Sequence, residues 1–241
     1  METPLGRDVD AQTLAKLERL STPAGAPADP VEAAQLRELA FWRWVAFEGY
    51  DGGGPQDFPA FQRRLMLGCY SQTGWSIDRF RDRRAFEFGC GPLGMIEFLP
   101  CRERFAYDPL NPHYALLFEK VRSPSISYLS ASREIASIGA VDLGICFNVL
   151  DHTPDAWGSF EMFFATIRSG GAFILQVNTV RDGYARSSEH ASMHPSPLAA
   201  ETVLAWVRGK SDDVQFTLAD QPSADNEFFL QTWGTRTGAR T

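Results

Sequence analysis

Apolar and polar positions divide the chain into an N-terminal part with helical periodicity and a longer part in which apolar stretches alternate with amphipathic ones. Leucines three residues apart predict an amphipathic helix within residues 8–20. Residues 29–48 predict a second helix, whose Asp-Pro start suits an N-cap followed by the first helical position. Residues 58–69 predict a third. No strand pattern occurs before Ala85, so we expect residues 1–80 to form a helical cap.

From residue 84 onwards, short apolar stretches predict β-strands that are mostly separated by helices. The predicted strands cover residues 85–87, 105–107, 126–129, 141–147, 172–178, 214–218 and 228–233. The predicted helices cover residues 95–99, 111–120, 155–168 and 198–208, and Gly170 and Gly171 are expected to end the third of them. Alternation of this kind predicts an α/β fold built on a parallel sheet. Since only a loop separates the last two strands, the last strand should be antiparallel.

Large apolar side chains crowd the second predicted helix, where Phe41, Trp42, Trp44, Val45 and Phe47 occur within seven positions. They are too many for one face of a solitary helix. Aromatic side chains bury large areas and dominate cores, so packing against another element is one interpretation. Lining of a binding pocket is the other, and for it Trp42 is the candidate.

Composition and charge narrow the class of protein. The 241 residues are 44% hydrophobic and 22% charged, which is ordinary for a soluble globular protein. A net charge of −7 argues against a nucleic-acid partner, whose binding depends on clustered Lys and Arg. No apolar run approaches the roughly 20 residues of a membrane span, and the N-terminus has no secretion signal. We therefore expect a cytoplasmic protein without a nucleic-acid or membrane partner.

The four cysteines and four histidines show no metal-ligand spacing. No C-x-x-C pair occurs, and no histidine stands at a zinc-ligand distance from a cysteine. Reduced, buried thiols and the absence of a metal are therefore expected.

The first predicted strand leads into the glycine pattern Gly89-x-Gly91-x-x-Gly94. Glycines at this spacing allow a tight turn and a close approach to a ligand, and the helix predicted after them would present its free N–H groups and the positive end of its dipole. The pattern also satisfies the dinucleotide fingerprint, so a nicotinamide-dependent oxidoreductase is one interpretation. Glu87 disfavours it, because a buried acid beside the turn would repel a pyrophosphate. A turn that binds nothing is the remaining alternative.

Glu87 followed by the sequence Gly-Cys-Gly-Pro resembles motif I of the class I S-adenosylmethionine-dependent methyltransferases. The resemblance implies a three-layer, Rossmann-like sheet of seven strands, with residues 1–80 as a cap for substrate recognition. Residues 81–241 would then bind S-adenosyl-L-methionine. The residues that the resemblance assigns to this cofactor are Glu87, Gly89, Cys90, Gly91, Asp108, Ala131, Ser132 and Asn148.

Asp108 follows Gly89 by nineteen residues, at the end of the second predicted strand. An acid about 20 residues after the glycine turn is the expected acceptor of ribose hydroxyl hydrogen bonds. Capping of the helix that begins near Asn111 is the alternative. The assignment of Ala131 and Ser132 to the adenine is looser, because the acid that the family usually has there is replaced by a Ser-Ala-Ser segment.

The fourth predicted strand is followed by Asn148-Val149-Leu150-Asp151-His152, which resembles motif IV of many small-molecule methyltransferases. Ligands of open α/β sheets lie outside the carboxyl ends of the strands. Asn148 would therefore contact the methionine part of the cofactor. His152 could act as a general base, since its pKa lies near working pH, or could only brace the loop.

The connection over residues 179–197 is long and polar, whereas most connections take about 4–6 residues. Loops at the ligand end of a sheet often hold substrate. Arg181, Tyr184 and Arg186 are the substrate-binding candidates, together with Trp42 in the cap. His190 and His194 compete with His152 for the role of base. A surface insertion without a binding role is the alternative.

The resemblance implies methyl transfer to a hydroxyl or amine of a small polar acceptor, such as a sugar-like or natural-product molecule. The alternatives are the NAD(P)-dependent oxidoreductase and a non-catalytic protein with the methyltransferase fold. A homodimer is compatible with the sequence.

Overall fold

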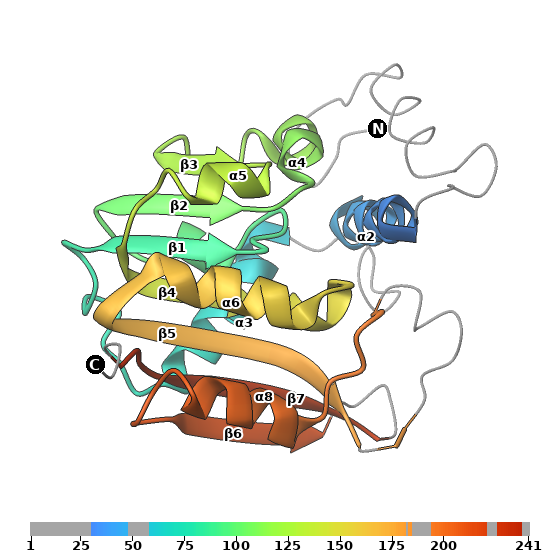
Figure 1. Ribbon diagram of the computed structural model, residues 1–241. Coiled ribbons are helices and arrows are strands. Elements are labelled where there is room, and N and C mark those ends of the chain that lie inside the picture. Colours follow the sequence, from blue (N-terminus) through green and yellow to red (C-terminus); the bar gives the residue numbers. More distant parts are fainter. Residues whose placement is uncertain (1–29, 48–57, 182, 185–193, 221–225, 238–241) are drawn as a thin grey trace.

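The computed structural model describes residues 30–47, 58–181, 183–184, 194–220 and 226–237. Its centre is a seven-stranded sheet with the strand order β3-β2-β1-β4-β5-β7-β6 (Figure 1). The strands are β1 (Arg84–Phe88), β2 (Glu103–Tyr107), β3 (Ile126–Leu129), β4 (Val141–Phe147), β5 (Ile167–Val180), β6 (Gln215–Asp220) and β7 (Glu227–Thr235).

The pairing of the strands fixes the edge at which a ligand can bind. β1 pairs in parallel with β2 and β4, and β4 pairs in parallel with β5. β7 is antiparallel to both of its neighbours, β5 and β6. The carboxyl ends of β1, β2, β4 and β5 therefore meet at one edge, and the predicted α/β sheet with an antiparallel last strand is confirmed.

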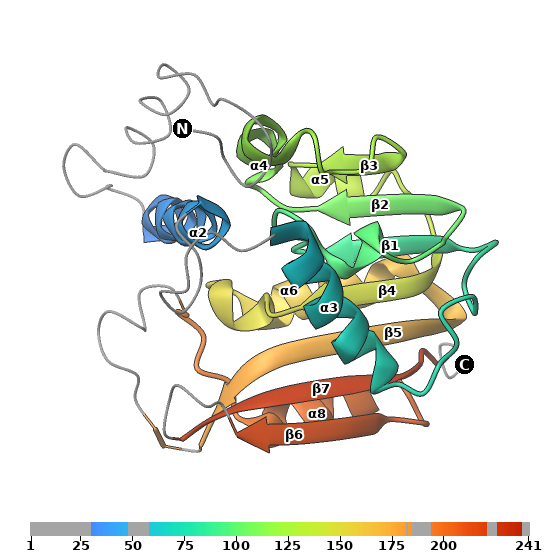
Figure 2. The ribbon, with the colours of Figure 1, turned by 180° about the vertical axis from the view of Figure 1, so that it is seen from behind.

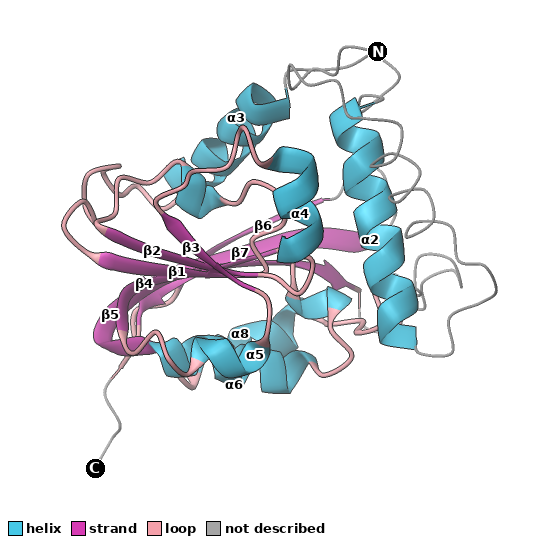
Figure 3. Cartoon of the chain, turned by 90° about the horizontal axis from the view of Figure 1, so that it is seen from above, coloured by secondary structure: helices cyan, strands magenta, loops and turns pink. Residues whose placement is uncertain are grey.

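Helices cover both faces of the sheet, which gives the three predicted layers (Figure 3). One face carries α5 (Ser132–Ile135), α6 (Ala156–Thr166) and α8 (Ala200–Arg208). The other carries α3 (Phe58–Ser71) and α4 (Asn111–Phe118), and Figure 2 shows α3 lying across it. Helix α2 (Pro30–Phe47) lies beyond the carboxyl ends of the strands instead.

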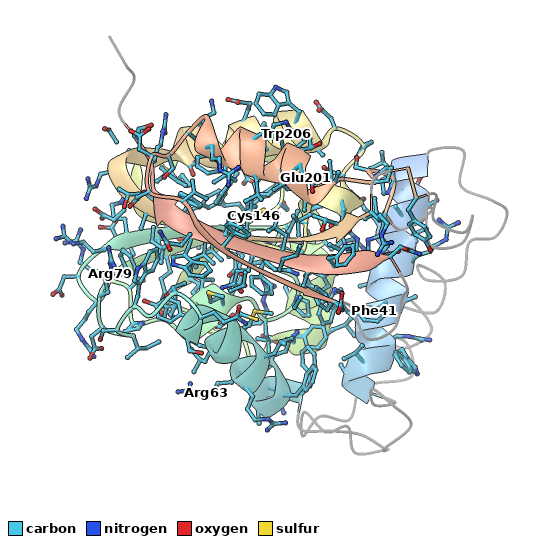
Figure 4. The ribbon with its side chains drawn as sticks, turned by 90° about the horizontal axis from the view of Figure 1, so that it is seen from below. Phe41, Arg63, Arg79, Cys146, Glu201 and Trp206 are labelled. Carbon is cyan, nitrogen blue, oxygen red and sulfur yellow. The ribbon has the colours of Figure 1, made fainter. Side chains whose placement is uncertain are left out.

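The core has a separate apolar cluster on each side of the sheet. Phe160, Phe163 and Phe164 of α6 pack with Val203 and Val207 of α8 under one face. On the other face, Met66 and Tyr70 of α3 pack against strand residues that include Ile145 and Ile174. Cys146 lies in the interior (Figure 4). Of the four free thiols, Cys90, Cys101 and Cys146 are buried and Cys69 is partly exposed.

The predicted helix over residues 95–99 is wrong, since only a 3₁₀ turn, η2 (Met95–Glu97), forms there. Glu87 accepts the first N–H groups of this turn, and Pro100 cannot continue a helix. The expected helix dipole is therefore absent at the turn after β1.

The predicted role of Gly170 and Gly171 as the stop of a helix is also wrong, because both lie inside β5. Gly170 has φ +71°, and the register between β4 and β5 shifts at this point. A Cβ on Gly171 would lie 2.8 Å from Cγ2 of Ile167. The two glycines therefore allow a bulge that brings β5 back into register.

The remaining expectations concern the cap and the membrane. The predicted helix over residues 8–20 lies outside the described residues, and the helices predicted from residues 29 and 58 are α2 and α3. The division at residue 80 stays a prediction. In the part of the chain that the structure describes, no helix combines the length and apolarity needed to cross a bilayer.

Candidate active site

A cleft of about 1340 Å³ opens at the carboxyl edge of the sheet. Its walls come from α2, from the turn after β1, from the segment after β4, and from the strands β5, β6 and β7. Figure 4 shows Phe41, one of the lining residues, on the side of α2 that is next to the sheet. The site is therefore where ligands of open α/β sheets bind.

Glu87 organises the turn at the base of the cleft. Its Oε1 accepts a hydrogen bond from the Met95 N–H at 3.0 Å, and its Oε2 accepts one from the Ile96 N–H at 2.9 Å. A Cβ on Gly94 would lie 2.3 Å from the Glu87 carboxylate, so only glycine fits there. Burial raises the pKa of Glu87 to about 8, although the two N–H groups oppose the shift.

Gly89 and Gly91 have φ +73° and +55°, in the left-handed region that favours glycine. A Cβ on Gly89 would lie 2.2 Å from Cγ2 of Val149, so the end of β1 packs directly against the segment after β4. At Gly91 the indole of Trp42 would be the nearest group, at 3.7 Å. The glycines thus serve close packing around the cleft as well as the turn itself.

Asp108 ties the glycine turn to the end of β2. Its Oδ2 accepts the Gly91 N–H at 3.0 Å, and its Oδ1 accepts the Leu110 N–H at 2.9 Å. Burial raises the pKa of Asp108 to about 6. The side chain bonds to the turn that precedes α4, but the N-cap of α4 is Leu110 and no side chain caps it, so Asp108 is not the cap of this helix. Hydrogen bonding to ribose hydroxyls stays a prediction.

The rings of two histidines lie close together at the cleft, tilted by 52° to each other. The ring centroids of His152 and His194 are 4.1 Å apart, and both rings line the cleft. Nδ1 of His194 lies 2.7 Å from Oδ2 of Asp151, whose side chain is fully buried. A carboxylate in this position stabilises the tautomer with the proton on Nδ1, so Nε2 of His194 is the basic nitrogen.

His152 has a second carboxylate beside it. Its Nδ1 lies 3.4 Å from Oε2 of Glu38 on α2, and its Nε2 lies 3.3 Å from the amide nitrogen of Asn148. Asn148 has φ +55°, which its position at the sharp exit from β4 requires. Glu38 also accepts a hydrogen bond from the Trp42 indole at 2.6 Å. The cap helix is therefore connected to the histidine pair.

The charges around the cofactor end of the cleft are mainly acidic. Glu38, Glu87 and Asp108 line it, and among the described lining residues Arg37 is the sole lysine or arginine. An anionic pyrophosphate would meet two buried carboxylates here, whereas a cationic ligand would relieve their desolvation. The residues present therefore fit a positively charged sulfonium such as that of S-adenosylmethionine.

Nine of the predicted site residues line this cleft: Trp42, Glu87, Gly89, Cys90, Gly91, Asp108, Asn148, His152 and His194. Ala131 and Ser132 stand at the start of α5, away from the lining residues, as do Arg181 and Tyr184 after β5. Arg186 and His190 lie outside the described residues. The roles assigned to all of these residues stay predictions.

Three residues of the cleft, Glu38, Gln176 and Asn178, and the buried Asp151 behind His194 were not among the predicted site residues. Asp151 stands in the motif that carries His152, but its partner His194 is 43 residues away. Gln176 and Asn178 are polar residues inside a strand that is otherwise apolar. Such positions in a buried strand could have indicated a binding site.

Asp151, His152 and His194 also form a group whose ligand atoms lie within 4.8 Å of one another. Histidine and carboxylate are common ligands of divalent metals. The expectation that no metal binds rested on spacing along the sequence, which does not reveal this group, and it stays a prediction.

Comparisons with known proteins identify the fold. No protein-family model and no curated protein matches the sequence. Solved structures do match. An N-methyltransferase, NodS from Bradyrhizobium japonicum, solved with S-adenosyl-L-homocysteine, is 16% identical with a TM-score of 0.54, and the match covers 94% of this chain and 99% of that one.

Two proteins from Burkholderia thailandensis match in the same way. An O-methyltransferase family protein is 14% identical with a TM-score of 0.52, over 94% of this chain and 77% of that one. A 1,6-didemethyltoxoflavin-N1-methyltransferase is 18% identical with a TM-score of 0.51, over 90% and 95%. The chain therefore has the Rossmann-like fold of the class I methyltransferases, as its glycine motif predicted.

Proposed function

We propose that the protein is an S-adenosylmethionine-dependent methyltransferase that acts on a hydroxyl or amine of a small polar molecule. The observation that carries the proposal is the content of the cleft. The glycine turn, Asp108, His152 and His194 all line it. A site for a methyl donor and a candidate base thus share one cavity.

The residues of the glycine turn would hold the cofactor. S-adenosylmethionine, when bound, supplies a methyl group carried on a positively charged sulfur. Glu87 and Asp108 stabilise a cation when they are ionised, and a bound cation in turn lowers the raised pKa of each. Asp108 is also the candidate for the ribose hydroxyls. The indole of Trp42, above Gly91, excludes water from this end of the cleft.

His194 is the residue best placed to take a proton from the acceptor. Asp151 holds its Nδ1 and stabilises the imidazolium that forms when Nε2 accepts the proton. His152, beside it, is held by Glu38 and Asn148, and its ring contacts the His194 ring at a tilt and helps to orient it. Most of the acceleration would come from holding acceptor and donor in near-attack geometry.

Binding and turnover test this proposal separately. Calorimetric titration should show binding of S-adenosylhomocysteine and none of NAD or NADP. Methyl transfer to a panel of small hydroxyl and amine compounds should then release S-adenosylhomocysteine. Binding of NAD without S-adenosylhomocysteine would favour the oxidoreductase, and failure of every acceptor despite cofactor binding would favour the non-catalytic alternative.

The small-molecule class of acceptor has independent support. The matching Burkholderia protein was solved with 1,6-didemethyltoxoflavin, a small molecule. The net charge of −7 also disfavours a nucleic-acid acceptor. Oligomeric state and cytoplasmic location stay predictions.

A further inference from the structure

One part of the cleft, which we call the amide lobe, lies between α3 and the face of β5, β7 and β6. Gln176 and Asn178 are two positions apart on β5, so they lie on the same face. Gln231 and Phe229 of β7 stand directly opposite them in the register. All four residues line the cleft, and Thr217 and Ala219 of β6 continue the two rows.

Buried amide groups in the amide lobe have unsatisfied oxygens. Oε1 of Gln176, Oδ1 of Asn178 and Oε1 of Gln62 on α3 have no hydrogen-bond partner among the described residues. Their side chains are only 5%, 4% and 1% exposed. A buried polar atom without a partner destabilises the folded protein, so three that line one cavity indicate a ligand that donates hydrogen bonds.

The amide lobe carries no formal charge on its described lining residues. Its polar groups are the three amides named above together with Gln72, Thr217 and Gln231. Gln231 donates to the Cys69 carbonyl at 2.9 Å, and Thr217 donates to Gln72 at 3.0 Å, so both fix the end of α3 against the sheet. A charged ligand group would find no counter-ion here.

The amide lobe adjoins the proposed base. The backbone N–H of Asn148 donates to the backbone carbonyl of Gln176 at 2.9 Å. The side-chain amide nitrogen of Asn148 lies 3.3 Å from Nε2 of His152. The ring of Phe229 offers an apolar surface beside Asn178. A ligand with hydroxyls on its edge and C–H groups on its face matches this combination.

We propose that the amide lobe is the acceptor site and that it selects an uncharged, polyhydroxylated group of the sugar or polyol type. This inference rests on the proposed function. The amides of Gln62, Gln176 and Asn178 accept hydrogen bonds from hydroxyls of the acceptor, and Phe229 packs against its ring. The hydroxyl that is methylated faces His194.

The test uses the full chain saturated with S-adenosylhomocysteine and pairs of probes that differ in charge. Methyl glycosides of neutral hexoses are compared by ligand-observed NMR with the methyl glycosides of the corresponding uronic acids. The variant Q176L/N178L removes two of the amides at similar volume. Gln215→Leu, on an exposed position of β6 outside the cleft, is the matched control.

Neutral glycosides should bind at least about tenfold more tightly than the uronates. In Q176L/N178L the affinity for the neutral glycosides should fall by about tenfold or more. The affinity for S-adenosylhomocysteine should change less than about twofold in both variants, which also shows that they are folded. The inference would be overturned, with the proposed function left intact, if uronates bound as tightly as neutral glycosides. The same holds if Q176L/N178L kept the native affinity for neutral glycosides. Failure of S-adenosylhomocysteine to bind the native chain would overturn both.

Discussion

At the scale of single residues, Glu87 combines burial with two backbone hydrogen bonds. Its pKa is raised to about 8 against an ordinary value of 4.5, so the folded protein binds a proton that the unfolded chain releases between these values. The free energy of unfolding should therefore fall as pH rises from about 5 to 8, by on the order of 1 kcal/mol per pH unit.

Glu87→Gln tests this directly, since an amide keeps one acceptor oxygen and cannot ionise. Urea unfolding at several pH values should show a flatter dependence in the variant than in the native chain. If the two curves run parallel from pH 5 to 8, Glu87 does not cause the slope. Protonation of Glu87 should also weaken the binding of a cationic cofactor, because the cation is stabilised by the ionised carboxylate. The cofactor should therefore bind more tightly at pH 8 than at pH 6.

The Asp151–His194 pair makes a different prediction. Removing a general base typically lowers turnover by 10²- to 10⁴-fold, so His194→Gln should reduce kcat by about that range for a hydroxyl acceptor. Asp151→Asn should cause an intermediate loss, because the imidazole keeps its place and loses the stabilising charge. His152→Gln serves as the comparison. A larger loss in His152→Gln than in His194→Gln would reverse the roles of the two histidines.

The same cluster allows a metal experiment. If His194 acts as a base, incubation with EDTA should leave the rate unchanged. Loss of activity that added Mg²⁺ or Zn²⁺ restores would instead make Asp151, His152 and His194 ligands of a metal. Spacing along the sequence could not reveal this group, because His194 is 42 residues away from His152 and only the fold brings the two side chains together.

At the scale of elements, the structure depends on the contact between the end of β1 and the segment after β4. Gly89→Ala would place a methyl group 2.2 Å from Val149 and force an alanine to φ +73°. The two effects should destabilise the protein by about 2–5 kcal/mol. Val149→Ala should restore part of this loss in the double variant, and thermal unfolding of all four proteins measures the coupling. Additive losses would mean that the two positions do not interact.

The elements also show what a sequence can and cannot predict. Strands β3 and β4 were predicted with the observed bounds, because each is a short, mainly apolar run that is followed by a polar residue. The errors at residues 95–99 and 170–171 both arise from tertiary contacts that local preference does not reveal. The Glu87 carboxylate accepts the N–H groups of Met95 and Ile96, and Gly171 packs against Ile167 at a bulge inside β5.

Site residues on strand ends were predictable because motif and topology place them at one edge. Glu38, Gln176 and Asn178 were not, because their role depends on which residues face them across the cleft. Gln176 faces Gln231 through a pairing that spans 55 residues of chain, and no local pattern specifies it.

At the scale of the whole molecule, α2 closes the cleft by contacts with several distant parts of the chain. Leu39, Val45 and Ala46 pack with Leu93 and Leu110, and Glu38 reaches His152. A cofactor bound beneath Trp42 would join α2 to the glycine turn, so binding should order both together. A ligand at 100 times its Kd stabilises the folded state by about 2.7 kcal/mol, which for a protein of this size raises Tm by roughly 5–10 °C.

Hydrogen exchange locates that stabilisation within the molecule. S-adenosylhomocysteine should slow exchange most in α2 and in residues 89–94, whereas the β6–β7 pair, at the far side of the sheet, serves as the internal control. Adding a neutral methyl glycoside to the complex should then slow exchange in β6 and β7 as well, because the amide lobe lies on these strands. If the cofactor alone protects β6 and β7 as strongly as α2, the cofactor and acceptor ends of the cleft are not the separate regions that the lining residues define.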